Sequence, residues 1–525
     1  MANPSLQIGD SNWAIKEDNL LGYSKAGTRF VPQPITMTRA SAGTRVNSAG
    51  LVETVELLGS ELVTNGDFAT DSDWTKGTGW IINDGKAINT GGANFSDLTQ
   101  NNTDVTIGKT YKITYTISDY TSGSIKFIMN NNSAAGAERN ANGTYTDYIS
   151  ALSQGYSFRT QGSGFIGKID NISVKESTKN NLARVDYTDG TSSLLAEPQR
   201  TNLIPYSEDF SNGIWQKQTG VTPTYNTTET LSPDGTYNAT KFIGNGSSGV
   251  LRAGISITGV VARSVYLKSV TGTVNVVLKD PNQTVTSKSL TITTEWQRFD
   301  LTEDNTIALQ GIWIDDIPVS GIYMWGAQLE EGSYATSYIP TDGSTVTRIQ
   351  DQYEKTGISD LINSEEGVLF VEAALLIDDD SNKYITLTDV LGENKVQIDF
   401  DYSTLRLQYV VSSGTVTQCN IKIPYTGTNM DKIAVKWKVN DFAIWINGVE
   451  VFTDNSGAVP TGLNQLYLSS TGGGLGSDFY GKVKQLQVYN TALTDEQLLQ
   501  LTGESGTDFY ESYAEMATAL TYTIQ

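Results

Sequence analysis

Residues 431–456 read DKIAVKWKVNDFAIWINGVEVFTDNS, and large apolar side chains recur at every second position within its runs. The alternation runs through "IAVKWKV" and "FAIWI", which is typical of strands with one buried face. Asn447 and Gly448 stand between "FAIWI" and "VEVF". An Asn-Gly pair fits a two-residue hairpin because both turn positions take positive φ. The stretch therefore predicts three antiparallel strands in a meander.

One more strand and a short helix are predicted over residues 478–501, DFYGKVKQLQVYNTALTDEQLLQL. Thr494 and Gln497 have the spacing of a capping box. The ending "VYNTALTDEQ" and the upstream "INGVEV" resemble the closing segments of laminin-G and concanavalin-like lectin domains. That resemblance implies a β-sandwich over residues 348–505. Such domains hold calcium with loop carboxylates, which Asp378 to Asp380 would supply, although a solvated acidic loop is the commoner arrangement.

Two earlier stretches share one pattern, an Asp-Phe pair followed by Trp, in "ELVTNGDFATDSDW" (61–74) and "PYSEDFSNGIW" (205–215). Further blocks recur in the same order, such as "GKTYKITYTISDY" (108–120) and "VARSVYLKSVTG" (261–272), both with alternating apolar positions. Ordered recurrence predicts two copies of one antiparallel sandwich. Large aromatics are usually buried, so the repeated ones are expected to pack where the first strand joins each sandwich: Phe68, Trp74, Phe210 and Trp215.

The first copy, with "NGDF" and "IDNISV", resembles jelly-roll carbohydrate-binding modules of a family often attached to xylanases. The second, with "MWGAQLEEGSYATSYIPT", resembles a jelly roll common in tailed-phage structural proteins. The first resemblance implies a structural calcium ion carried by Asp67 and Asp170. The alternative, that both are ordinary turn or edge carboxylates, is the more common case. No other cofactor is expected.

The sequence thus predicts an all-β protein of serial antiparallel β-sandwiches, two jelly rolls followed by a laminin-G/concanavalin A-like sandwich. The expected divisions are a virion-docking or linker segment with a β-hairpin (1–57), the first jelly roll (58–177), a linker (178–200), the second jelly roll (201–347), the lectin-like domain (348–505) and a tail (506–525).

Composition excludes several kinds of site. The 525 residues include no histidine and one cysteine, Cys419, so histidine-based triads and thiolate zinc cages are unavailable. The net charge of −22 opposes binding to nucleic acid. No apolar run approaches the ~20 residues that span a bilayer, so membrane insertion is not expected. The first residues lack a signal-peptide pattern, which predicts synthesis in the host cytoplasm.

A split motif indicates a virion. "MTRASAGTRVNSAGLVET" (37–54) and "NNLARVDYTDGTSSLLAEPQRTNL" (180–203) together resemble one continuous signature of tailed-bacteriophage virion proteins, interrupted here by the first jelly roll. The resemblance implies a virion location on tail or capsid, with other virion proteins as partners. Residues 1–35 are expected to dock onto them. The resemblance also implies a homo-oligomer, for which closed symmetry is the default. Long β-rich appendages are often trimeric, so a trimer is the leading form, although nothing in the sequence counts subunits.

The leading hypothesis is a structural fibre, appendage or decoration protein that assists adsorption to bacterial surface glycans. Sugar rings stack on exposed aromatic side chains, and the candidates are Trp80, Tyr120 and Trp313, although each is more often a packing residue.

A secreted carbohydrate-binding adhesin is the alternative, and the missing signal peptide and the phage-like motif weigh against it. A polysaccharide-cleaving appendage enzyme is a third hypothesis. A glycosidase needs two carboxyl groups about 5–5.5 or 6.5–9.5 Å apart. Asp315 and Asp316 are adjacent, as are Glu365 and Glu366, and neighbours on a strand face opposite sides. No domain-sized region remains for a catalytic barrel, so no enzymatic activity is expected.

Overall fold

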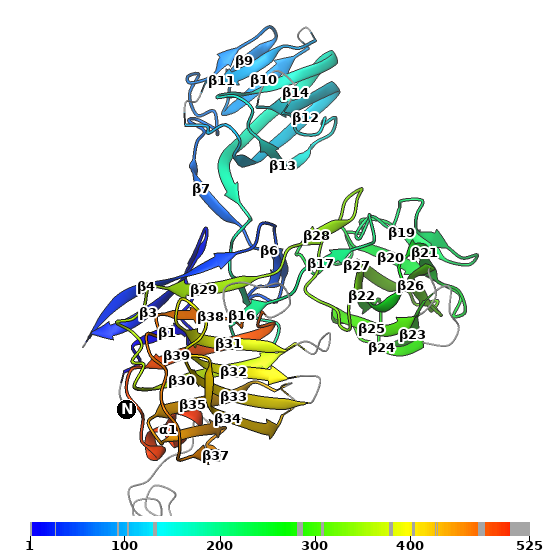
Figure 1. Ribbon diagram of the computed structural model, residues 1–525. Helices are drawn as coiled ribbons and strands as arrows, with labels where there is room; N and C mark the ends of the chain where they lie inside the picture. Colours follow the sequence, from blue (N-terminus) through cyan, green and yellow to red (C-terminus); the bar gives the residue numbers. More distant parts are fainter. Residues whose placement is uncertain are drawn as a thin grey trace, which may run out of the picture. The chain divides into compact units, whose positions relative to one another are not determined.

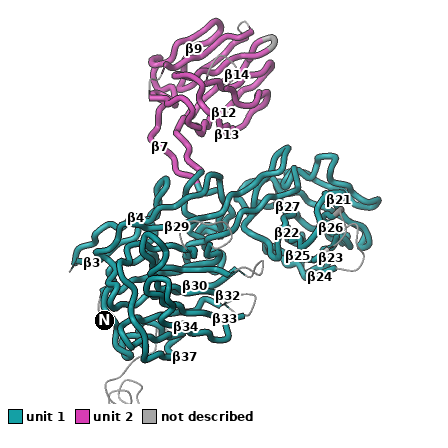
Figure 2. Tube along the Cα trace, in the orientation of Figure 1, with its two compact units in different colours: residues 1–55, 180–525 teal, residues 56–179 magenta. Residues whose placement is uncertain are grey.

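The computed structural model of the chain describes residues 3–26, 28–91, 94–101, 104–129, 134–280, 287–305, 309–376, 382–401, 405–425, 427, 429–470 and 478–503. These residues are dominated by antiparallel strands, which confirms the all-β prediction. The chain separates into two compact units, one of residues 1–55 and 180–525, the other of residues 56–179 (Figure 2). Within the described ranges, no helix has the length and apolar character needed to cross a membrane.

The unit of residues 56–179 contains one eight-stranded antiparallel sheet (Figure 1). Its longest strands, β12 (Thr110–Ile128) and β14 (Tyr156–Thr178), pair along much of their length with several shifts in register. The first strand pairs with the end of the last, Leu57 opposite Thr178, so the unit begins and ends on adjacent strands. The other strands are β7 (Leu57–Glu61), β8 (Thr75–Lys76), β9 (Trp80–Asn83), β10 (Lys86–Thr90), β11 (Asp97–Gln100) and β13 (Gly143–Ser150).

Residues 201–347 contain two five-stranded antiparallel sheets that enclose one core. The first sheet is, in order, β18 (Gln216–Lys217), β21 (Val250–Ser256), β26 (Leu309–Asp315), β23 (Val274–Lys279) and β24 (Ser287–Ile292). The second is β19 (Thr222–Thr224), β20 (Thr240–Ile243), β27 (Ile322–Glu331), β22 (Gly259–Ser269) and β25 (Gln297–Asn305). A two-stranded sheet, β17 (Arg200–Asn202) with β28 (Val346–Arg348), pairs the ends of this segment.

The repeated aromatic pattern has the same geometry in both copies. Phe68 and Trp74 are buried with ring centroids 5.4 Å apart, and Phe210 and Trp215 are buried with centroids 4.8 Å apart. Each indole N–H donates to the carbonyl oxygen nine residues earlier, at 3.1 Å in the first copy and 2.8 Å in the second. The packing role predicted for these residues is confirmed.

The remaining strands form one antiparallel sheet that folds into two layers around a shared core. In pairing order they are β34 (Val416–Pro424), β33 (Arg406–Ser413), β32 (Lys395–Asp401), β31 (Lys383–Thr388), β38 (Gln465–Tyr467), β29 (Gln352–Thr356), β4 (Arg29–Thr38), β3 (Asn19–Ala26), β1 (Leu6–Gly9), β39 (Gly481–Tyr489), β30 (Glu366–Leu375), β35 (Asp431–Lys438), β36 (Phe442–Ile446) and β37 (Val449–Asp454). Three short strands pair with members of this sheet. β2 (Ile15–Lys16) pairs with β3, β16 (Ser193–Ala196) pairs with β39, and β15 (Arg184–Asp186) pairs with β16.

The position of the N-terminal strands corrects the predicted boundaries. Residues 1–57 and 178–200 were expected to dock or link, yet β1 and β16 share one edge of β39, with Leu6 opposite Val488 and Leu194 opposite Val483. Leu6 and Leu194 are buried in the same core as residues of β30 to β36. An uncovered edge of β39 would leave backbone groups unpaired, which explains why distant segments complete this sandwich.

The local predictions in the C-terminal domain are confirmed. Asn447 and Gly448 have φ of 48° and 82°, as the predicted hairpin requires. Helix α1 (Asp495–Thr502) begins after Thr494, whose side chain accepts from Gln497 N–H in a complete capping box. Leu498 of this helix packs on the outer face of β30, β35 and β36. The hairpin predicted within residues 37–54 is also present, as β5 (Thr44–Val46) and β6 (Val52–Thr54). The predicted tail, 506–525, lies outside the described residues.

Deletion of residues 1–10 is expected to destabilise the C-terminal sandwich by more than about 4 kcal/mol, because loss of one core aliphatic side chain costs about 2–5 kcal/mol and Leu6 and Ile8 are both buried there. Urea unfolding measures the change. As a control, replacement of residues 57–178 by a short Gly-Ser linker is expected to leave the midpoint unchanged, since Leu57 and Thr178 are neighbours. An unchanged midpoint after the N-terminal deletion would contradict the assignment of β1.

Candidate functional site

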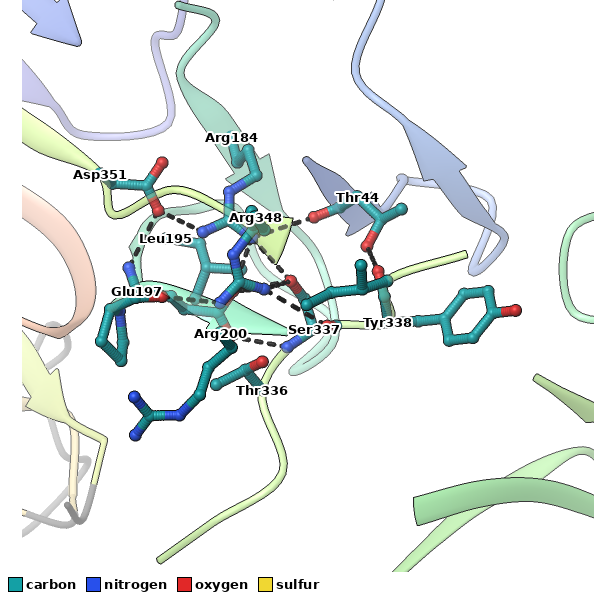
Figure 3. A network of polar contacts seen from close by, with 12 residues as sticks. Thr44, Arg184, Leu195, Glu197, Arg200, Thr336, Ser337, Tyr338, Arg348 and Asp351 are labelled. Atoms are coloured by element: carbon teal, nitrogen blue, oxygen red, sulfur yellow. Dashed lines mark hydrogen bonds and ion pairs between the residues drawn. The ribbon is translucent and has the colours of Figure 1, made fainter. Parts of the chain in front are cut away.

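Two features stand out in the unit of residues 1–55 and 180–525: a buried ionic cluster and an aromatic cleft. The cluster, called here the arginine network, draws its members from both halves of the split motif, from the second jelly roll and from the residues just after it. Figure 3 shows the part of the network around Arg184, Glu197 and Arg348. Its arginine, aspartate and glutamate members are buried, and its one serine is partly buried. They are Arg39, Arg184, Glu197, Ser337, Arg348 and Asp351.

Asp351 joins the first two segments of the network. Its Oδ1 lies 2.6 Å from Arg39 Nη1, and its Oδ2 pairs with Arg184 Nη2. The same Oδ2 accepts the backbone N–H of Glu197 at 2.9 Å, and Asp351 N–H donates to the Glu197 carbonyl oxygen at 3.0 Å. One carboxylate therefore ties together residues that follow β4, lie on β15 and follow β16.

Glu197 joins the remaining segments. Its Oε2 lies 2.6 Å from Arg184 Nη1 and 2.9 Å from Arg348 Nη1, and it accepts the Ser337 hydroxyl at 2.6 Å. The Ser337 N–H donates to Oε1 at 2.7 Å. Figure 3 shows the Arg184 and Arg348 guanidinium groups converging on this glutamate.

The carboxylates of the network are held ionised. Burial alone would raise the pKa of Glu197, but Arg348 and Arg184 lower that pKa well below its usual range. Burial is likewise outweighed at Asp351, where Arg184 and Arg39 lower the pKa. Paired and buried charges of this kind hold segments in one geometry, and they present no exposed nucleophile or base to a substrate. The arrangement is that of a structural joint.

Asn202, in "EPQRTNL", makes a second buried joint. Its amide N–H groups donate to the carbonyl oxygens of Ala327 and Ile339 at 3.2 and 2.9 Å. Its oxygen accepts from the N–H groups of Ile204 and Leu329 at 3.1 and 3.2 Å. The side chain thus fixes the start of the jelly roll to its last long strand, β27, and to the segment that follows this strand.

The aromatic cleft has a volume of about 430 Å³ and lies between the β5–β6 hairpin and the second jelly roll. Val52 N–H donates to the Pro233 carbonyl oxygen at 2.8 Å, which fixes the hairpin against the loop of residues 230–233. The floor comes from the outer face of β22 and from the residue preceding β25. The lining residues are Val46, Gly50, Leu51, Val52, Thr230, Leu231, Ser232, Pro233, Tyr266, Lys268 and Trp296.

The aromatic rings of the cleft are oriented by fixed contacts. Trp296 is half-buried and its indole N–H donates to the Leu231 carbonyl oxygen at 2.8 Å. Tyr266 packs edge-on to Trp325, with ring centroids 5.4 Å apart. The alternation in "SVYLKS" places Tyr266 and Lys268 on the face opposite the buried Val265 and Leu267. The sequence pattern placed Tyr266 and Trp296 in framework strands and did not predict a site there. The alternation in "SVYLKS" does indicate that Tyr266 and Lys268 face away from the core.

A second pocket, of about 370 Å³, has an acidic lining and lies at one end of the same jelly roll. Its least exposed carboxylate, Glu208, accepts hydrogen bonds from the Tyr338 hydroxyl and from the Asn238 amide, each at 2.8 Å. Burial raises the pKa of Glu208 to about 7, and the nearby charges of Asp234 and Asp342 act in the same direction. This carboxyl group therefore titrates near neutral pH.

The structure corrects the proposed ligand role of Trp80. Its side chain is 4% exposed and stacks on Phe165 inside the core, so it offers no surface to a sugar. Tyr120 is half-buried at the margin of the same core, and its hydroxyl donates to the Gly123 carbonyl oxygen at 2.9 Å. A glycan contact by Tyr120 stays a prediction.

Trp313 lies on β26 and is half-buried. The Lys279 Nζ sits 3.8 Å from the centroid of one of its rings, and it also pairs with Asp315 Oδ2 at 2.6 Å. The Lys279 ammonium therefore already occupies one face of the Trp313 ring. Trp80 and Tyr120 belong to the unit of residues 56–179, and Trp313 belongs to the other unit.

The predicted calcium carriers lie on neighbouring segments, because Ile172 N–H donates to the Gly66 carbonyl oxygen at 2.9 Å. Asp67 is exposed, and Asp170 Oδ2 lies 3.9 Å from the Lys86 ammonium. No additional carboxylate in the described chain completes a metal-binding group of three or more. Calcium usually takes six to eight oxygen ligands. Calcium binding by this pair stays a prediction.

The other predicted calcium loop comprises Asp378, Asp379 and Asp380, and all three lie outside the described residues.

No family model matches the chain, and no curated protein matches it. Among solved structures it is similar to the CBM40 of the Ruminococcus gnavus IT-sialidase, with 15% identity over 27% of this chain and 84% of that one and a TM-score of 0.24. It is also similar to the tandem CBM22 domain of Paenibacillus barcinonensis Xyn10C, with 12% identity, coverage of 52% of this chain and 98% of that one, and a TM-score of 0.20. A third similar structure is the Trypanosoma rangeli sialidase in complex with sialic acid, with 7% identity, coverage of 95% of this chain and 93% of that one, and a TM-score of 0.23. All three TM-scores lie below 0.5, so none of these likenesses assigns a fold or a function to the chain.

Substitution of Asp351 by Asn is expected to lower the free energy of unfolding by about 3–5 kcal/mol, because it leaves buried guanidinium groups without their counter-charge. Asp300→Asn is the control: that carboxylate lies 3.9 Å from Lys288 in an exposed pair, and such pairs contribute about 0–1 kcal/mol. Urea unfolding at pH 7 compares the two. Equal effects would show that the network does not hold the joint.

The same network predicts a loss of stability in acid. Glu197 and Asp351 have folded-state pKa values below those of the unfolded chain, where carboxyl groups titrate near pH 4. Their contribution is complete above about pH 5 and is lost as pH falls through 4 toward the folded values. Unfolding free energies measured from pH 7 to pH 3 should fall more steeply for the natural chain than for Asp351→Asn.

Glu208 is expected to act in the opposite sense. Its pKa is raised to about 7 in the folded protein, so the unfolded chain releases this proton first as pH rises. Glu208 therefore reduces stability progressively between about pH 4.5 and 7, with no further change above that range. Glu208→Gln should remove this decline in unfolding free energy. An identical pH profile for both proteins would show that Glu208 is not protonated in the folded state.

Proposed function

We propose that the chain is a non-catalytic structural protein of a tailed-phage virion, and that its aromatic cleft binds glycans of the bacterial surface. The cleft is the observation that carries the binding proposal. It combines the fixed indole of Trp296 with the ring of Tyr266 and with side chains that bear hydroxyl or ammonium groups, Thr230, Ser232 and Lys268. Sites for small polar ligands take this form, with an apolar wall and a few polar groups that set orientation.

The virion proposal is supported by what the split motif builds. Its two pieces supply Arg39, Arg184 and Glu197, which meet in the arginine network. Buried and paired charges such as these three hold chain segments together, and this agrees with the structural role that the phage resemblance implies. Head or tail location, contacts with other virion proteins and a trimeric state belong to the same proposal.

Absence of catalysis is also part of the proposal. Asp315, one of the acidic residues considered for glycoside cleavage, is buried and paired with Lys279, whereas Asp316 is exposed. A glycosidase also uses two carboxyl groups in different environments, but the charge of Asp315 is already balanced by the Lys279 ammonium, which occupies one of its oxygens. The cleft itself is lined by no carboxylate.

A glycan-binding screen of the purified full chain tests the binding proposal. Trp296→Ala should reduce binding to any recognised glycan at least tenfold, because it removes the fixed ring of the cleft. Tyr237→Ala is the control, since Tyr237 is an aromatic of the same jelly roll that is 54% exposed and lies outside the cleft. Equal loss in both variants, or binding that survives Trp296→Ala, would place the glycan elsewhere.

A further inference from the structure

We infer that the ligand of the aromatic cleft is an acidic saccharide whose carboxylate pairs with Lys268. This inference rests on the proposed glycan-binding function and narrows it to one class, polysaccharides that contain uronic acid residues. It comes from the position of one lysine in the cleft and from the charges around it.

Lys268 stands beside the indole of Trp296. Strand β22 pairs with β25 so that Tyr266 is opposite Arg298 and Leu267 opposite Gln297. The next position of this register places Lys268 opposite Trp296, and both line the cleft. A sugar ring lying against the indole would therefore hold its carboxylate within reach of the ammonium group.

Lys268 has no counter-charge among the described residues. Its Nζ donates to the Thr230 hydroxyl at 3.1 Å, and no carboxylate of the described chain lies within ion-pair distance. Three other lysines of the same jelly roll have such a partner: Lys241 with Glu229, Lys279 with Asp315 and Lys288 with Asp300.

The charge that lines this cleft is the positive charge of Lys268. The other residues that line the cleft are uncharged, whereas the chain as a whole carries a net charge of −22. Arg298, whose guanidinium lies 5.5 Å from the centroid of the Tyr266 ring, already donates to the Thr336 carbonyl oxygen and the Ser264 hydroxyl. An ammonium–carboxylate hydrogen bond is about twice as strong as a neutral one, so Lys268 supplies the selectivity.

The test compares acidic polysaccharides with their neutral counterparts. Oligosaccharides of polygalacturonate, alginate and hyaluronate, each with its carboxyl-reduced form, are titrated calorimetrically into the full chain. We expect at least one acidic form to bind about tenfold more tightly than its reduced form, which corresponds to about 1.4 kcal/mol. Lys268→Met should abolish that preference, and Lys288→Met, which removes an exposed lysine outside the cleft, should keep it.

The outcomes separate this inference from the function on which it rests. Equal affinity for acidic and reduced forms, with loss of both in Trp296→Ala, would overturn the choice of an acidic ligand and leave glycan binding intact. A preference for the acidic form that survives Lys268→Met would overturn the role of this lysine. No binding of any acidic form would overturn the inference outright. Thermal unfolding of each variant distinguishes loss of the site from loss of the fold.

Discussion

The pairing of Arg184 with Asp351 and Glu197 is the constraint on which this structure depends. A guanidinium group removed from water requires counter-charges at fixed positions, and here these come from residues 13 and 167 positions along the chain. Arg39 and Arg348 complete the network from two further segments. The ends of the second jelly roll and the edge of the C-terminal sandwich are therefore fixed at one place.

The same constraint explains how a complete domain is accommodated between residues 55 and 180. The residues of the network lie outside that interval, and the inserted unit begins and ends on paired strands, Leu57 opposite Thr178. The two pieces of the split motif can therefore meet while the chain between them folds around its own core. The first and last described strands of the chain, β1 and β39, also pair with each other, so one sandwich uses both ends of the described sequence.

Local signals in the sequence predicted local structure well. Asn447-Gly448 and Thr494 specify a turn and a helix start through their own backbone and side chain, and the repeated aromatic pattern predicted the same Phe–Trp packing in two places. The pairing of Leu6 with Val488 was missed because nothing in either segment specifies a partner 482 positions away. The burial of Arg39 was missed for a similar reason, since charged residues are mostly exposed unless a distant partner neutralises them. The candidate site was predicted least well, because Trp296 resembles a framework residue until the β5–β6 hairpin covers that face.

Hydrogen exchange across the sandwich tests the central claim most directly. If the network and the shared edge of β39 make one structure, backbone amides of residues 6–9, 194–196 and 485–488 should exchange with similar free energies of opening, near the highest in the chain. Rapid exchange of residues 6–9 and 194–196, with residues 485–488 still protected, would contradict the account. It would mean that the C-terminal sandwich stands without the N-terminal strands and that the split motif only links domains.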